Sequence, residues 1–181
     1  MPDSKPYWAR PYPIPLKNCK VIEEEVYRQC KIGAVGQLSP EEVEEREWAS
    51  PAFGVLKKSG TIRLVMDFRK LNESLIRKQY PLSTIEELIT AIMGFDFASV
   101  LDLNMGYLSV PLKEASKKLL NIVMPFGYFE CKVLPMRIKP ATDIFQSHMV
   151  GIFMSMKVKT KPNPCIDDIL HSKGRTFDDH L

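Results

Sequence analysis

The spacing of apolar residues along the chain predicts helices at 21–31 and 141–156. In the second helix the following residues recur at helical spacing and are expected to face the core: Ile144, Phe145, Met149, Ile152, Phe153 and Met156. Ser39-Pro40-Glu41-Glu42 is a capping box and predicts a short acidic helix. Ser83 and Thr84 cap a further helix that is expected to end near Gly94.

Alternating and apolar runs predict short strands between these helices. The expected strands are 53–57, 62–67, 97–103, 107–112, 119–124 and 128–134. Lys58-Ser59-Gly60-Thr61 joins the first two as a hairpin, and Pro125-Phe126-Gly127 joins the last two. The prolines of residues 1–20 predict an extended arm. This order predicts an α+β fold, an antiparallel sheet backed by helices.

One apolar stretch, residues 165–170, contains two adjacent carboxylates, Asp167 and Asp168. Two carboxylates about 4 Å apart repel by roughly 4 kcal/mol at an effective dielectric near 20. Since neighbouring strand residues point to opposite faces, both can converge only at a tight turn between two strands. A hairpin tip that holds Mg²⁺ or Mn²⁺ would relieve the repulsion. The alternative is a plain turn, because aspartate is a common turn residue.

The composition is that of a folded protein: 181 residues, 45% hydrophobic and 26% charged, enough for one domain or two small lobes. No apolar run approaches the roughly 20 residues of a membrane span, and the polar N-terminus shows no secretory signal. The four scattered cysteines form no metal motif or disulfide framework. We therefore expect an intracellular chain with free thiols and no membrane partner.

Charge is unevenly distributed, although the net charge is only +3. Residues 57–78 carry seven basic side chains against Asp67 and Glu73. Such a block suits a polyanion partner, or it is an ordinary solvated surface.

A third carboxylate, Asp102, ends the expected strand 97–103. In an antiparallel sheet this strand can lie beside the Asp167-Asp168 hairpin. Three carboxylates on adjacent strands suit two Mg²⁺ ions in a phosphoryl displacement. Lys58 and Arg63, on the 53–67 hairpin, would then hold a nucleotide triphosphate, and the basic block a template backbone. The alternative for these two side chains is the charged protection of an edge strand.

The sequence resembles the fingers and palm of a reverse transcriptase, most closely the Ty3/gypsy type of LTR retrotransposon. The resemblance covers about residues 12–181. It rests on these stretches in family order: Trp48-Ala49-Ser50-Pro51, GTIRLVMDFRKLN (60–72), YPLSTIEEL (80–88), SVLDLNMGYLSVPL (99–112), MPFGYFECKVLPM (124–136), IFQSHM (144–149), IDDIL (166–170) and HSKGRTFDDHL (171–181).

The resemblance implies a palm sheet backed by helices and a fingers subdomain with a β-hairpin, with no thumb. Residues 21–95 would be mainly fingers and 96–181 mainly palm. By this resemblance, the catalytic, metal-binding aspartates are Asp102, Asp167 and Asp168, and the Leu103 carbonyl is a further metal ligand. The triphosphate would be bound by Lys58 and Arg63. Tyr107 would lie under the incoming sugar and favour deoxynucleotides, and Gln146 would be structural.

The implied activity is RNA-directed DNA polymerisation with two Mg²⁺ ions, or Mn²⁺, as cofactors. Its partners would be dNTPs and an RNA or DNA primer–template. Departures from the family pattern favour, as an alternative, an inactive remnant that binds nucleic acid or a protein. Cys165 replaces a tyrosine, prolines precede the aspartate pair, and Arg137 replaces a glycine at a turn that it would obstruct or distort. A third possibility is an unrelated two-metal nuclease.

Overall fold

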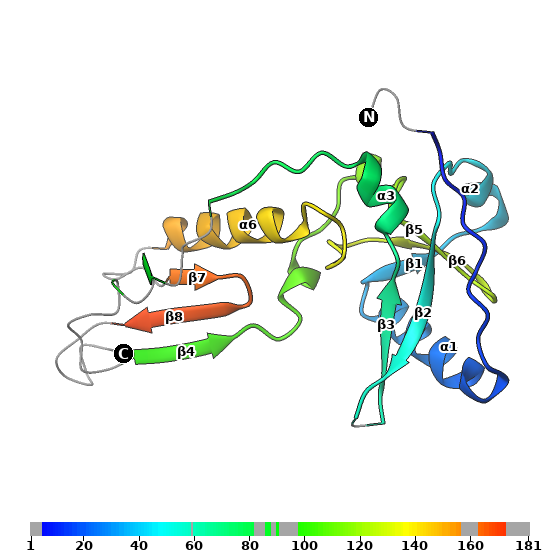
Figure 1. The fold of residues 1–181 in the computed structure, drawn as a ribbon, viewed down its shortest axis with the longest axis horizontal. Helices are drawn as coiled ribbons and strands as arrows, with labels where there is room; N and C mark the ends of the chain where they lie inside the picture. The colour runs from blue at the N-terminus through cyan, green and yellow to red at the C-terminus, as the bar shows by residue number, and fades with distance from the viewer. Residues whose placement is uncertain are drawn as a thin grey trace. The chain divides into compact units, whose positions relative to one another are not determined.

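The computed structural model describes residues 5–58, 60–81, 86–87, 90, 98–156 and 163–172. The chain forms two compact units, Met1–Ile76 with Tyr107–Lys139, and Arg77–Gly106 with Pro140–Leu181 (Figure 1). Each unit combines helices with a small sheet, which confirms the predicted α+β class.

The first unit is built on a five-stranded sheet in the order β1-β6-β5-β2-β3. All of its strand pairs are antiparallel except the parallel pair β2–β5. The strands are β1 Val35–Gln37, β2 Ser50–Leu56, β3 Ile62–Met66, β5 Asn121–Met124 and β6 Gly127–Cys131. The helices around them are α1 Leu16–Lys31, α2 Pro40–Glu44, α3 Arg69–Ser74 and α5 Glu114–Lys117. The two hairpins predicted around 58–61 and 125–127 are confirmed.

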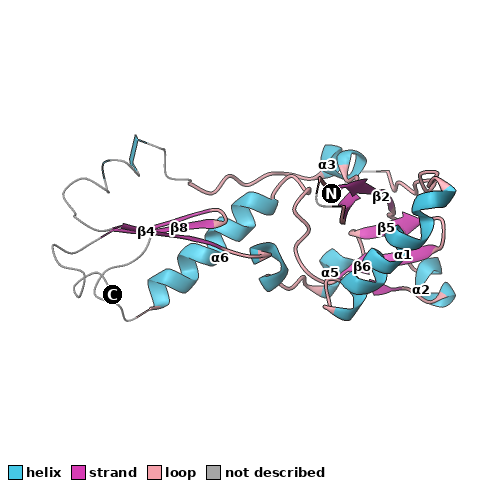
Figure 2. Cartoon of the chain, turned by 90° about the horizontal axis from the view of Figure 1, so that it is seen from below, coloured by secondary structure: helices cyan, strands magenta, loops and turns pink. Residues whose placement is uncertain are grey.

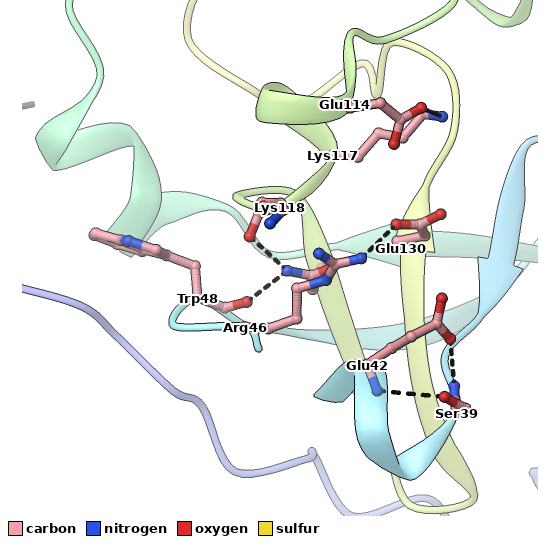
Figure 3. A network of polar contacts seen from close by, with 9 residues as sticks. Ser39, Glu42, Arg46, Trp48, Glu114, Lys117, Lys118 and Glu130 are labelled. Carbon is pink, nitrogen blue, oxygen red and sulfur yellow. Dashed lines mark hydrogen bonds and ion pairs between the residues drawn. The ribbon is translucent and has the colours of Figure 1, made fainter. Parts of the chain in front are cut away.

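Helix α1 begins at Leu16, within the stretch expected to be an extended arm. Pro15 is the N-cap residue and lies just outside the helix, so its missing N–H removes no intrahelical bond, and the expected arm was too long. The helix ends before Gly33, which has φ +76°, as the sequence predicted. The capping box of α2 is also confirmed, since Ser39 and Glu42 exchange both hydrogen bonds (Figure 3).

A polar network ties the chain before β2 to strands β5 and β6 (Figure 3). Arg46 Nη2 lies 3.0 Å from Glu130 Oε2, and both side chains are largely buried. The buried Asn121 donates from Nδ2 to the Trp48 carbonyl at 2.9 Å and to the Lys118 carbonyl at 2.8 Å. These bonds hold the start of β2 against β5 and thereby fix the base of the β2–β3 hairpin.

Residues 107–112 do not form the predicted strand. Gly106–Ser109 is a short 3₁₀ helix, η1, and the Val110 amide bonds back to the Tyr107 carbonyl. Pro111 makes only an isolated bridge to Val133, because proline has no N–H to donate to a ladder. The residues 82–85, 88–89 and 91–97 lie outside the described part, and with them most of the helix expected after Ser83.

The second unit holds helix α6, Ala141–Ser155, and a three-stranded antiparallel sheet in the order β4-β8-β7. The strands are β4 Ala98–Asp102, β7 Asn163–Cys165 and β8 Asp168–Ser172. Helix α6 packs against β7, beside the sheet in both views (Figures 1 and 2). The predicted apolar face is only partly correct, because Ile144 and Ile152 are 42% and 38% exposed, whereas Asp143 and Gln146 are buried.

Asp143 is paired within this unit, which explains how a buried carboxylate is tolerated. Its side chain is 3% exposed and accepts from Arg77 Nε at 2.6 Å, from Arg77 Nη2 at 3.2 Å and from the Tyr80 amide at 3.0 Å. The Arg77 guanidinium, and then the Tyr80 amide, lower the pKa of Asp143. The pair anchors the segment after α3 to the first turn of α6.

We predict that Arg77→Gln lowers the free energy of unfolding at neutral pH by more than the control variant below does, because the Asp143 side chain loses its charge-assisted partners. The pKa of Asp143 is lower in the folded chain than in the unfolded chain. The pair therefore stabilises the fold fully at pH values above the unfolded pKa of about 3.9, and this stabilisation is lost as the pH falls through the folded pKa. Urea unfolding at pH 7 and pH 3 measures both effects. The exposed pair Arg28–Glu25 supplies the control, Arg28→Gln. Equal destabilisation by the two variants at pH 7 would contradict the prediction.

Candidate active site

The sheet of the second unit brings the three predicted aspartates to one end. Asp102, the last residue of β4, is the register partner of Asp168, the first residue of β8. Directly opposed residues of antiparallel strands have Cβ atoms about 4.5–5.5 Å apart. The Leu103 amide donates to the Asp167 carbonyl at 2.8 Å, so the backbone next to Asp102 is bonded to the hairpin turn.

The hairpin that carries the aspartate pair turns at Ile166 and Asp167, because Cys165 pairs with Asp168. Ile166 has φ +57°, whereas Asp167 is not among the residues of positive φ, the pattern of a type II′ turn. Glycine is usual at that first position, and a β-branched residue in the left-handed region is strained by about 1–3 kcal/mol. Strained backbone conformations of this kind are common at functional sites, where surrounding contacts stabilise them.

Helix α6 supplies such a contact. The buried Gln146 accepts at Oε1 from the Ile166 amide at 2.8 Å. The hydrogen bond runs from the packed face of the helix to the first residue of the strained turn. Gln146 was expected to be structural. Its hydrogen bond to the Ile166 amide gives it such a role, because it holds the turn that carries Asp167.

The charge at this end of the sheet is strongly negative. Burial raises the pKa of Asp167, and the neighbouring Asp102 and Asp168 carboxylates raise it further. Asp167 Oδ1 is buried and has no hydrogen-bond partner among the described residues. None of the ion pairs in the described segments involves these three aspartates. An unpartnered buried carboxylate oxygen beside two like charges fits a hard divalent cation.

The described side chains are not arranged as a complete metal-binding site. In the part of the chain that the structure describes, no three His, Cys, Asp or Glu side chains are gathered closely enough to hold a metal ion. The backbone therefore places the three aspartates together, and the convergence of their oxygens on a metal stays a prediction. The same is true of the Leu103 carbonyl as a ligand.

The proline before the aspartate pair does not disrupt the hairpin. Pro164 is in β7, which has a partner on one side only in the three-stranded sheet, and its register partner is Ile169. In a hairpin with a two-residue turn, the flanking pair Cys165–Asp168 is the hydrogen-bonded one, so the Pro164–Ile169 pair needs no ladder donor. Pro164 therefore costs the hairpin no ladder hydrogen bond, while residues 157–162 lie outside the described part.

The predicted nucleotide-binding residues belong to the first unit. Lys58 is exposed just after β2, and Arg63 is exposed in β3, opposite Val55. Tyr107 is only 5% exposed, in η1. The sequence reasoning missed Asn72 of α3, whose side chain makes two hydrogen bonds to the backbone of residues 137–139, and its position at the end of the 60–72 motif was the available signal.

We predict that Ile166→Gly folds more stably than Ile166→Ala, by about 1 kcal/mol, because only glycine adopts φ near +57° without a Cβ clash. Both variants remove the rest of the side chain, so their difference isolates backbone strain. At an ordinary strand position alanine is the more stable of the two. Chemical unfolding of both variants measures the difference, and an equal or more stable alanine variant would show that the turn is unstrained.

The fold resembles a segment of retroviral reverse transcriptases. The foamy viral protease-reverse transcriptase in complex with an RNA/DNA hybrid matches with TM-score 0.80 and 18% identity, over 98% of this chain and 23% of that one. The native prototype foamy virus protease-reverse transcriptase matches with TM-score 0.75 and 21% identity, over 94% of this chain and 22% of that one. At these identities the likeness shows the fold.

Curated relatives at the sequence level come from a retrotransposon. The Transposon Tf2-3 polyprotein of Schizosaccharomyces pombe (strain 972) is 29% identical over 168 residues, 92% of this chain and 12% of the polyprotein. The Tf2-7 polyprotein is 29% identical over 169 residues. The chain is thus homologous to these Ty3/gypsy polyproteins, which confirms the predicted resemblance, and it spans about 12% of their length. No family model matches. Helices long and apolar enough to cross a membrane are absent from the described residues.

Proposed function

We propose that this chain carries the polymerising site of an RNA-directed DNA polymerase. The observation that carries the proposal is the meeting of Asp102, Asp167 and Asp168 at one sheet end, on a strained turn that Gln146 holds. Homology to retrotransposon polyproteins supports it, as does the likeness to reverse transcriptases solved with an RNA/DNA hybrid and with double-stranded DNA. As the resemblance implies, residues 21–95 would be mainly fingers and residues 96–181 mainly palm.

In this proposal the three carboxylates, with the Leu103 carbonyl, hold two Mg²⁺ or Mn²⁺ ions. When bound, these ions neutralise charge on the attacking and leaving oxygens of an in-line phosphoryl displacement. Asp167 is suited to this role because it has a buried oxygen with no hydrogen-bond donor among the described residues. The turn backbone, held by Gln146 and by the Leu103 amide, keeps that oxygen in place while the strands on either side present Asp102 and Asp168.

The first unit would supply the nucleotide contacts. Lys58 and Arg63 are exposed cations on the β2–β3 hairpin, and guanidinium and ammonium groups bind the oxygens of a triphosphate. Tyr107, held in η1, would lie against the sugar and disfavour a 2′-hydroxyl. The exposed basic block at 57–78 would contact the template backbone, so binding should weaken steeply with salt.

Primer extension by the purified 181-residue chain tests the proposal. On an RNA template at low salt, with Mg²⁺ or Mn²⁺, the chain is expected to extend a DNA primer with dNTPs in preference to NTPs. Tight primer–template binding without extension would favour a non-catalytic, nucleic-acid-binding remnant. Cleavage of the substrate without extension would favour a two-metal nuclease.

A further inference from the structure

The loop 135–139 of the first unit is held firmly by a residue far away in the sequence. Asn72 Nδ2 donates to the Arg137 carbonyl at 2.9 Å, and Asn72 Oδ1 accepts from the Lys139 amide at 2.7 Å. Between these two points Ile138 is buried, at 7% exposure. One amide side chain therefore uses its donor and its acceptor to fix the backbone of three consecutive residues, and the side chains of Met136 and Arg137 remain exposed.

Arg137 does not distort this loop as the sequence suggested. Its φ is not positive, since the non-glycine residues of positive φ in the described segments are Met105 and Ile166. The backbone there needs no glycine, and the Arg137 side chain is exposed. Arginine in place of the expected glycine thus adds a cation to the surface without the strain expected of it.

A second guanidinium lies against the same loop. Arg63 Nη2 is 3.7 Å from the Met136 sulfur. A thioether is a weak acceptor and carries no charge, so it leaves the positive charge of Arg63 uncompensated. Within the described ranges neither Arg63 nor Arg137 takes part in an ion pair. Arg63 thus contacts Met136, the residue before Arg137, and two exposed cations without an ion-pair partner among the described residues favour an anionic ligand of high charge density.

We infer that Arg137, positioned by Asn72, is an additional polyphosphate-binding residue that acts with Arg63 on the triphosphate of the incoming nucleotide. The inference rests on the proposed function and deepens it. A triphosphate suits this loop better than a nucleic-acid backbone, because its phosphates share bridging oxygens and concentrate several negative charges in a small space. Phosphates of a strand are separated by sugars. Guanidinium groups bind such oxygens in a fork, which gives geometry as well as charge.

Equilibrium binding of inorganic tripolyphosphate, dATP and dAMP to the whole chain tests the inference without requiring catalysis. Arg137→Ala is expected to weaken tripolyphosphate and dATP binding about five- to tenfold, the loss of one exposed charge-assisted contact, and dAMP binding by less than about twofold. The matched control is Lys31→Ala, which removes an exposed charge from the last turn of α1 and should change none of the three. Unchanged tripolyphosphate binding by Arg137→Ala overturns the inference. If binding of a single-stranded oligonucleotide, measured in the same way, is weakened by Arg137→Ala while tripolyphosphate binding is not, the inference is also overturned.

A double-mutant cycle tests the role of Asn72. Asn72→Ala should weaken tripolyphosphate binding about threefold or more, and combining it with Arg137→Ala should cause no further loss, because Asn72 acts through Arg137. Additive losses would overturn the positioning role. If the chain binds dATP through Arg137 but does not extend primers, the inference stands and the proposed polymerase activity fails. If the chain extends primers and Arg137→Ala does not change the rate at subsaturating dNTP, the polymerase activity stands and the inference about Arg137 fails.

Discussion

Replacing Asp167 by asparagine is expected to reduce primer extension by at least about 10³-fold while making the chain more stable. Activity falls because a neutral amide binds a divalent cation poorly. Stability rises because the folded protein holds the Asp167 carboxylate partly buried and next to Asp102 and Asp168, which raise its pKa. Asparagine removes that unfavourable charge and keeps nearly the same shape.

The pH dependence of this gain follows from the same shift. A raised folded pKa means that the folded chain holds the Asp167 proton more tightly, so the native state loses stability as pH rises from the unfolded pKa through the folded one. The stability difference between Asp167→Asn and wild type should therefore be small in acid and larger at neutral pH. Thermal unfolding across this range measures it. The control is Glu24→Gln, an exposed carboxylate on α1, which should leave both activity and stability nearly unchanged. A variant that is inactive and also less stable at neutral pH would contradict the electrostatic explanation.

Gln146→Leu is expected to lower primer extension about 10- to 100-fold, the range found when a residue that orients catalytic ligands is lost. The Ile166 amide loses the acceptor that it has at 2.8 Å, so the strained φ of +57° at the residue before Asp167 loses one of the contacts that hold it. The neighbouring exposed residue on α6 gives the control, Ser147→Ala, which should be neutral.

Adding Ile166→Gly to Gln146→Leu separates positioning from simple loss of packing. Glycine adopts the left-handed turn unaided, so the double variant should recover part of the lost extension. If Gln146 only fills space in the core, glycine at position 166 will recover nothing, because it restores no packing. Measuring extension rates for the four chains at saturating dNTP completes the comparison.

The sequence predicted the hairpins well because their signals are local. Asp167 and Asp168 stand between short apolar runs, and strand alternation requires a turn if both are to serve one site; the structure has that turn. The turn's backbone could not be predicted, because a β-branched residue such as isoleucine rarely adopts a φ near +57°. Its support, Gln146, lies 20 positions away in a helix whose apolar pattern suggested only packing.

The errors in the predicted elements also arise from backbone constraints and from contacts between residues far apart in the sequence. Residues 107–112 alternate as a strand does, yet Pro111 cannot join a ladder and the chain coils at Gly106 instead. The side chain of Asn72 reaches a loop 65 residues later, a contact that no local pattern indicates. Ile144 and Ile152 fit an apolar stripe in sequence, but α6 turns the polar Asp143 and Gln146 inward because each has a partner there.

Titration with Mn²⁺, followed by electron paramagnetic resonance, tests most directly whether the three aspartates form a metal site. Wild-type chain is expected to bind Mn²⁺ saturably. Asp102→Asn, Asp167→Asn and Asp168→Asn should each weaken that binding at least tenfold, whereas Glu24→Gln should not. Mn²⁺ affinity that is the same in the wild type and in all three aspartate variants would contradict the assignment of this sheet end as the catalytic centre.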